Sequence, residues 1–146
     1  MREILFRGKR KDNGEWVEGA FCQYDCPDPF APAVEKPCII KYGEPYSLFW
    51  FDVELETVGP FTGFYDKNKK KIFKGDILKS TYSDEPGEDI VCYEEIFWDN
   101  GWYLAEGGNR DRCDDLMQDC LSEYSEVVGN IWDNPELLEA LLEEMK

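Results

Sequence analysis

The chain has 146 residues, 42% of them hydrophobic and 15% aromatic, which suits one domain or two small lobes and excludes wholesale disorder. It contains no apolar run long enough for a membrane-spanning helix, and its lack of histidine excludes a Ser-His-Asp or Cys-His pair. The net charge of −16 arises after residue 79, because residues 1–79 hold 13 basic and 13 acidic residues and residues 80–146 hold 3 and 19.

The N-terminal region reads as a β-hairpin. Residues 4–7 predict a short strand, and Asn13-Gly14 predicts a tight type I′ turn, which needs positive φ at both central residues. The returning strand is expected over residues 15–24. A bulge at Gly19 would account for the break in its alternation of apolar and polar residues.

A proline-rich segment follows. Residues 25–37 contain four prolines, each of which removes a backbone donor, so a loop is expected there. Residues 38–42 and 46–58 predict two strands, and Gly59-Pro60 predicts the end of the second.

The middle of the chain predicts more short strands. Residues 61–65 and 71–73 flank a basic polar turn, and residues 76–82 form the next strand. Asp76 could be a ligand or a base. The structural interpretation is favoured, in which Gly75 supplies a backbone shape closed to other residues and Asp76 caps a turn.

The acidic half predicts a second hairpin. Residues 90–98 and 102–105 are strands joined through Asn100-Gly101. Residues 114–123 fit either a loop or one short helix, and residues 127–132 predict a last strand.

A helix is expected at the C-terminal end. Asn134 can serve as its N-cap, and Pro135 suits its first position. An apolar stripe follows, which we expect to pack on the protein itself; docking into a partner's groove or onto a second copy is the alternative. The stripe consists of Leu137, Leu138, Leu141, Leu142 and Met145.

No catalytic, cofactor-binding or metal-ligating residue is predicted. The six cysteines are expected to be reduced thiols, since no secretory signal is apparent, with a zinc site as the alternative. The many acids are interpreted as solvated surface. Their field repels phosphate and anionic lipid, so neither direct nucleic-acid binding nor membrane binding is expected.

Two stretches resemble the YopX family of phage and prophage proteins. They are residues 56–77, with Gly63, Gly75 and Asp76 as motif positions, and residues 128–138, with Gly129, Asn130 and Pro135. Residues 2–8 and 16–19 are similar to the opening of the family. This chain departs from the family pattern at Asn68-Lys69, where Asn-Gly is usual, and at Lys74, where an acid is usual.

The resemblance implies a phage or prophage accessory protein in the bacterial cytoplasm. It also implies a β-rich fold whose later part is a small SH3-like barrel, and it brings no catalytic residue.

We therefore expect a mainly-β (α+β) protein with a C-terminal helix, divided at 1–60 and 61–146 or forming one compact unit. The expected function is protein–protein interaction or self-assembly, without enzymatic activity and without a cofactor. An exposed patch around Phe49, Trp50 and Phe51 is the expected contact surface, with Leu137 and Leu141 as further contact residues. The alternatives are an acidic DNA-mimic decoy that occupies a host DNA-binding protein, and an enzyme with converging carboxylates.

Overall fold

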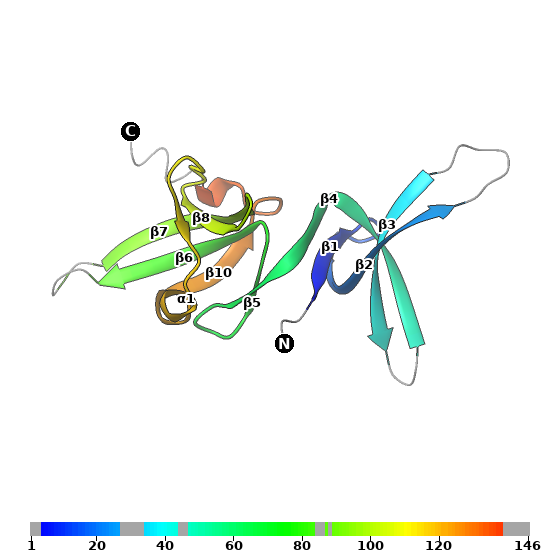
Figure 1. The fold of residues 1–146 in the computed structure, drawn as a ribbon, viewed down its shortest axis with the longest axis horizontal. Helices are drawn as coiled ribbons and strands as arrows, with labels where there is room; N and C mark the ends of the chain where they lie inside the picture. The colour runs from blue at the N-terminus through cyan, green and yellow to red at the C-terminus, as the bar shows by residue number, and fades with distance from the viewer. Residues whose placement is uncertain (1–3, 27–33, 44–46, 84–86, 88, 139–146) are drawn as a thin grey trace. The chain divides into compact units, whose positions relative to one another are not determined.

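The computed structural model describes residues 4–26, 34–43, 47–83, 87 and 89–138, which lie mainly in antiparallel strands (Figure 1). The mainly-β fold class expected from the sequence is confirmed. The chain divides into two compact units, Met1–Phe61 (unit 1) and Thr62–Lys146 (unit 2). This division falls one residue after the expected boundary. Within the described ranges, no helix is long and apolar enough to cross a membrane.

Unit 1 is a closed ring of four strands. Sequence neighbours pair with each other, and the first strand also pairs with the fourth, which closes the ring. Two hairpins, one formed by the second and third strands and the other by the third and fourth, extend from the ring as two ribbons (Figure 1). The strands are β1 (Phe6–Arg10), β2 (Trp16–Cys26), β3 (Val34–Gly43) and β4 (Ser47–Tyr65), which continues into unit 2.

The core of unit 1 is small. Val17, Ile39 and Val53 are its buried residues. They come from β2, β3 and β4, one from each strand, so this core requires all three strands to be in place. The partly buried residues packed against them are Phe6, Phe21, Phe51 and Val58.

Both expected Asn-Gly hairpins form, but neither turn is type I′. Gly14 has a φ of 72°, whereas Asn13 is outside the positive-φ region. The turn is wider than two residues, because Arg10 N–H donates to the Glu15 carbonyl (2.8 Å) and Gly14 N–H to the Arg10 carbonyl (3.0 Å). In the second hairpin only Asn100 has positive φ, at 56°. One left-handed residue thus completes each reversal.

The bulge expected at Gly19 is absent. Residues 16–19 pair in unbroken register with β1, and residues 20–26 pair with β3. The glycine has another cause: a Cβ at this position would lie 2.3 Å from the Ile40 carbonyl oxygen. Gly19 therefore lets the backbones of β2 and β3 approach closely where β2 changes partner.

The loop expected over residues 25–37 is wrong at both of its ends, and residues 27–33 lie outside the described residues. β2 continues to Cys26, and β3 begins at Val34 and includes Pro37, which lies opposite Gln23. β4 joins β3 only from Cys38 onward. Pro37 therefore has a neighbouring strand on one side, a position where its missing N–H is tolerated.

The break expected at Gly59-Pro60 is also wrong, because β4 continues through it and both residues pair with β1. The irregularity lies just before them, where the pairing shifts so that Lys9 faces Glu54. Thr57 stabilises this segment, since its hydroxyl donates to the Glu54 carbonyl (2.6 Å) and accepts from Lys9 N–H (2.9 Å).

Unit 2 has the connectivity expected of an SH3-like barrel. A four-strand meander is followed by a short helix and a last strand, which returns to pair with the first strand of the meander. Residues 114–123, for which the sequence fits either a loop or one short helix, divide into a short strand and this helix. The elements are β5 (Lys71–Phe73), β6 (Asp76–Ser83), β7 (Asp89–Trp98), β8 (Trp102–Glu106), β9 (Cys113–Asp115), α1 (Gln118–Tyr124) and β10 (Ser125–Asn130).

The core of unit 2 draws on almost all of these elements. The helix α1 contributes Leu121, and the segment before it contributes Leu116. Residues 136–138 form a helical turn directly after Pro135, where the C-terminal helix was expected. The buried core residues are Ile72, Leu78, Ile96, Leu104, Leu116 and Leu121.

Candidate interaction surface

One face of the β3–β4 hairpin exposes large apolar side chains. Tyr42 pairs with Leu48 and Ile40 with Trp50, and residues paired directly across an antiparallel ladder point to the same side. Tyr42 is 78% exposed, Trp50 57% and Leu48 49%. These four residues are called the apolar face. A contiguous apolar surface on a strand pair marks a contact site rather than ordinary surface composition.

The predicted aromatic run is divided between the two sides of the sheet. Trp50 lies on the apolar face, whereas Phe49 and Phe51 point to the opposite side, because successive strand residues alternate. Phe49 is half exposed and covers Gly43, where a Cβ would lie 2.1 Å from its ring. Phe51 packs on the core, with the Arg10 guanidinium 4.6 Å from its ring centroid.

The outer edge of β4 is open beside these residues. β1 pairs with β4 at Val53 and beyond, and Lys11 N–H donates to the Asp52 carbonyl (3.0 Å). Within the described part of the chain, the registers pair Ser47–Phe51 on one side only, with β3. This segment, called the open edge, is a position where a further strand can add to the sheet.

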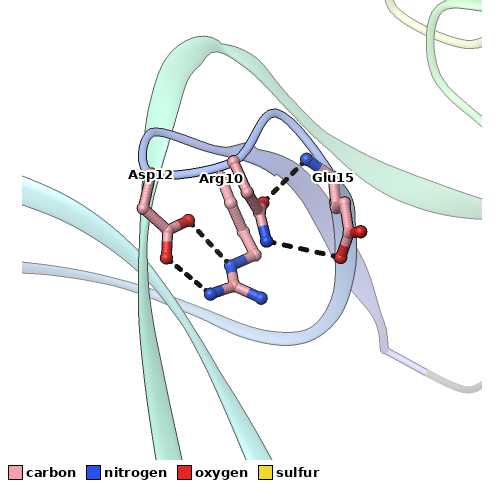
Figure 2. Close-up of polar contacts among 4 residues, drawn as sticks. Arg10, Asp12 and Glu15 are labelled. Atoms are coloured by element: carbon pink, nitrogen blue, oxygen red, sulfur yellow. Dashed lines mark hydrogen bonds and ion pairs between the residues drawn. The ribbon is translucent and has the colours of Figure 1, made fainter.

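The β1–β2 turn closes one end of the open edge. A hollow of about 390 Å³ lies there, lined by Arg10, Lys11, Asp12, Trp50, Phe51 and Asp52. Figure 2 shows the Arg10 guanidinium beside Asp12. Arg10 Nε donates to one carboxylate oxygen of Asp12 (3.0 Å) and Arg10 Nη2 to the other (2.6 Å). The hydrogen bond from Arg10 lowers the pKa of Asp12. On the other side of the turn, Asn13 accepts from the Glu15 N–H (2.9 Å).

Unit 2 contains a second hollow, of about 360 Å³. Its acidic lining residues are Glu94, Asp114 and Asp115, and apolar residues such as Leu104 and Leu121 form other parts of its wall. Glu94 is only 4% exposed. Burial raises its pKa, and the nearby charges of Glu106 and Asp114 act in the same direction.

A chain of hydroxyls supports the buried carboxylate of Glu94. The Ser80 hydroxyl donates to Glu94, and the Ser125 hydroxyl lies 2.7 Å from that of Ser80. Beside it, Glu95 is also buried and accepts from Arg110 at 2.6 and 3.2 Å. The interpretation of the acids as solvated surface is therefore wrong for these two residues. Two adjacent acids in the middle of an otherwise apolar strand were the available signal.

The hollow in unit 2 is not arranged as a metal centre. In the portion of the chain that the structure describes, no group of three or more Cys, Asp or Glu is placed to hold a metal ion. Its chemistry is that of an anionic pocket with an apolar wall, which suits a hydrogen-bond donor or a cationic side chain.

The two stretches that carry the YopX resemblance meet in unit 2. Gly75 has a φ of 88°, a Cβ on it would lie 2.4 Å from the Trp132 ring, and its carbonyl accepts from Ile131 N–H (2.9 Å). Asp76 accepts from Phe73 N–H (2.8 Å). These contacts hold a chain reversal against the start of the C-terminal segment.

The C-terminal motif residues form a compact turn of their own. Asn130 Oδ1 accepts from the N–H groups of Trp132 (3.0 Å) and Asp133 (2.8 Å). A Cβ on Gly129 would lie 2.4 Å from the Asn134 side-chain oxygen, and Pro135 begins the helical turn. Gly63, with a φ of 89°, is on β4.

Of the two leucines predicted as contact residues, the structure describes only Leu137. Leu137 is half-buried in the helical turn, as is Leu138. Leu141 lies outside the described residues, as do Leu142 and Met145.

Comparison with known proteins gives a fold and a family. The crystal structure of protein EF1440 from Enterococcus faecalis is similar, with a TM-score of 0.53 and 22% identity over 94% of this chain and 99% of that one. This likeness concerns the fold. No match is found among curated proteins. Residues 5–139 match the family described as YopX protein, so the chain belongs to the YopX family.

Proposed function

We propose that this protein acts by binding, and that two copies associate through the open edge and the apolar face of unit 1. The single observation that carries the proposal is the open edge itself, a strand of sequence Ser-Leu-Phe-Trp-Phe beside a face of exposed apolar side chains. Proteins normally shorten, charge or cover such edges, and this one contains no charge and no proline.

A second copy is the occupant that suits the edge best. Two copies related by a two-fold axis present the same strand in opposite directions, which is the arrangement of an antiparallel ladder. With the axis at Phe49, its ring faces the ring of the other copy, and Leu48 faces Trp50. Both of these pairings join apolar side chains, and Ser47 faces Phe51 at each end, so the strand carries no charge against its copy.

The distribution of charge supports the choice of unit 1. Unit 1 holds 7 basic and 11 acidic residues, a net of −4, and unit 2 holds 9 and 21, a net of −12. A partner attracted by charge would be drawn to unit 2. The uncharged open edge instead suits contacts made by backbone hydrogen bonds and apolar burial.

The wider role is proposed from the family. Membership supports an accessory role in a phage or prophage, in the cytoplasm of the bacterial host. The lack of histidine supports binding rather than catalysis.

The test is the molar mass in solution, measured by light scattering over a dilution series. We expect the wild-type mass to fall towards that of one chain on dilution. Leu48→Lys should abolish association, because it places a charge on the apolar face at the paired edge. Ile90→Lys is the matched control, since Ile90 is 48% exposed on β7 of unit 2. A wild type that is monomeric throughout, or equal loss in both variants, contradicts the proposal.

The acidic decoy is a second candidate, favoured by the carboxylates along the meander of unit 2. Glu94 pairs with Glu106, and Asp114 and Asp115 are exposed on the adjacent strand β9. Binding of a basic DNA-binding protein should then weaken steeply as salt is raised. A pull-down that is insensitive to salt removes this candidate, and Asp114→Asn with Asp115→Asn should weaken capture while Asp12→Asn should not.

A further inference from the structure

We propose that Cys22 and Cys38 form a redox-active dithiol site in unit 1, which a small disulfide such as oxidised glutathione converts into an intramolecular disulfide. The proposal rests on the register of β2 and β3, which places the two cysteines directly opposite each other. It does not depend on what the apolar face binds.

The register alone brings the pair within reach of a bond. Residues directly opposite in an antiparallel ladder have Cα atoms about 4.5 to 5.5 Å apart, and disulfides span Cα separations of about 4.4 to 6.8 Å. Besides burial, the proximity of Cys22 is one of the causes that raise the pKa of Cys38, as expected for two thiols that are close neighbours. Closure therefore requires side-chain rotation and a small backbone adjustment.

The other described cysteines lack this relation. Cys120 lies on α1, and none of the remaining ones has a cysteine opposite it in the described registers. The observed pairs are Cys26 with Val34, Cys92 with Ser80, and Cys113 with Ala105.

The environments of the two thiols assign them different parts in the exchange. Cys22 is half-buried and accessible to a small oxidant, whereas Cys38 is fully buried. The Cys22 thiolate attacks one sulfur of oxidised glutathione, forms a mixed disulfide and releases one glutathione thiolate. Cys38 then loses its proton and attacks the Cys22 sulfur, which expels the second glutathione. The protein loses two electrons and two protons, and the oxidant becomes two molecules of glutathione.

The second step should be the slow one near neutral pH. Burial, together with the neighbouring Cys22 and Asp52, raises the pKa of Cys38 to about 11. Only a small fraction of Cys38 is then thiolate, and the thiolate is the attacking species. The closing rate should rise about tenfold for each pH unit while the pH remains below that pKa.

The Cys22–Cys38 disulfide would restrain β3, the strand that carries part of the apolar face. Alternation along β3 places Cys38 on the same side of the sheet as Ile40, and hence as Trp50. The bond would join the two strands of the β2–β3 ribbon across the residues between Cys22 and Cys38. Because it restricts the unfolded chain, it should raise the Tm of unit 1 by about 10 °C.

The test incubates the full chain with oxidised glutathione, followed by alkylation, proteolysis and mass spectrometry. We expect a Cys22–Cys38 linked peptide in the wild type and in Cys113→Ser. In Cys38→Ser a glutathione adduct should accumulate on Cys22, because no second thiol displaces it. In Cys22→Ser the buried Cys38 should react much more slowly.

Several outcomes would overturn the proposal. They are an adduct on Cys22 of the wild type that persists at high pH, a linked peptide that joins other cysteines, and an unchanged Tm after closure. Circular dichroism of both serine variants shows whether they fold, and the Cys113→Ser variant keeps the test valid if one of them does not.

Discussion

Unit 1 gathers exposed apolar side chains on one face of the β3–β4 hairpin. Unit 2 also exposes apolar side chains, such as Trp98 and Met117, but its distinctive feature is that it buries carboxylates. Trp50 and Tyr42 of unit 1 are each more than half exposed. In unit 2, Asp66 and Glu95 are buried but have hydrogen-bond donors. Hydrogen bonds to a buried carboxylate account for its burial, so such a residue has a structural explanation. An exposed apolar face has no such explanation within its unit, so the comparison directs the search for function to unit 1.

The two aspartate turns show the same difference on a smaller scale. Asp12 organises the β1–β2 turn from the surface, through an ion pair with Arg10 at 2.6 Å. Asp66 organises the β4–β5 turn from the interior. Its carboxylate accepts from the N–H groups of Asn68 (2.9 Å), Lys70 (2.8 Å) and Val127 (2.9 Å), and so ties the turn to β10.

The largest effect is expected at the contact between Gly75 and Trp132. Gly75→Ala adds a Cβ in a left-handed conformation and against the Trp132 ring, so it should cost about 4 kcal/mol of unfolding free energy. Gly107→Ala is the matched control: Gly107 has a φ of 63° and nothing within 4 Å of the added Cβ, so it should cost about 1 kcal/mol. Denaturant titration measures both. Equal losses would show that the Trp132 contact adds nothing.

The next effect separates the two aspartate turns. Asp66→Ala leaves three backbone N–H groups without their acceptor and should cost about 3 kcal/mol. Asp12→Ala removes a surface ion pair and should cost less than about 1 kcal/mol. Thermal unfolding followed by circular dichroism gives the two values. Similar costs would contradict the distinction between a structural and a surface acid.

A smaller, pH-dependent effect is expected at Glu94. Its folded-state pKa is raised, so as pH rises the unfolded chain loses this proton first and stability is lost through that interval. Glu94→Gln keeps an acceptor for Ser80 and cannot ionise. Its Tm should therefore exceed that of the wild type at about pH 8, and the gain should shrink at about pH 4, below the ordinary glutamate pKa. Glu18→Gln, at an exposed acid of unit 1, should show no such trend.

Much of this fold could be predicted from the sequence, because strands and hairpins are encoded locally. The two Asn-Gly pairs marked both hairpins, and Asn134-Pro135 marked the start of the last helical turn. Local signals did not give the turn types, and they placed a strand end at Gly59-Pro60. That position is decided by pairing with β1, a partner about fifty residues away in sequence.

The candidate sites were harder to predict, because they depend on register and on contacts between distant residues. The aromatic run was predicted to be a contact surface, but its alternation places Trp50 on one side of the sheet and Phe49 and Phe51 on the other. The pairing of Cys22 with Cys38 follows from one register of β2 and β3, and a shift of one residue would remove it. The burial of Glu94 depends on Ser80, which is supplied by the neighbouring strand β6.

The smallest effect on stability is expected at Trp50, where the comparison between the units is sharpest. Trp50→Ser removes an indole that is more than half exposed, so the unfolding free energy of the isolated chain should change by less than about 1 kcal/mol. Leu104→Ala, at a buried position of unit 2, should cost about 3 kcal/mol without affecting association. The informative measurement combines denaturant unfolding at high dilution with light scattering at high concentration. Loss of association without loss of stability assigns Trp50 to contact with another molecule, whereas parallel losses would make it part of the structure of unit 1.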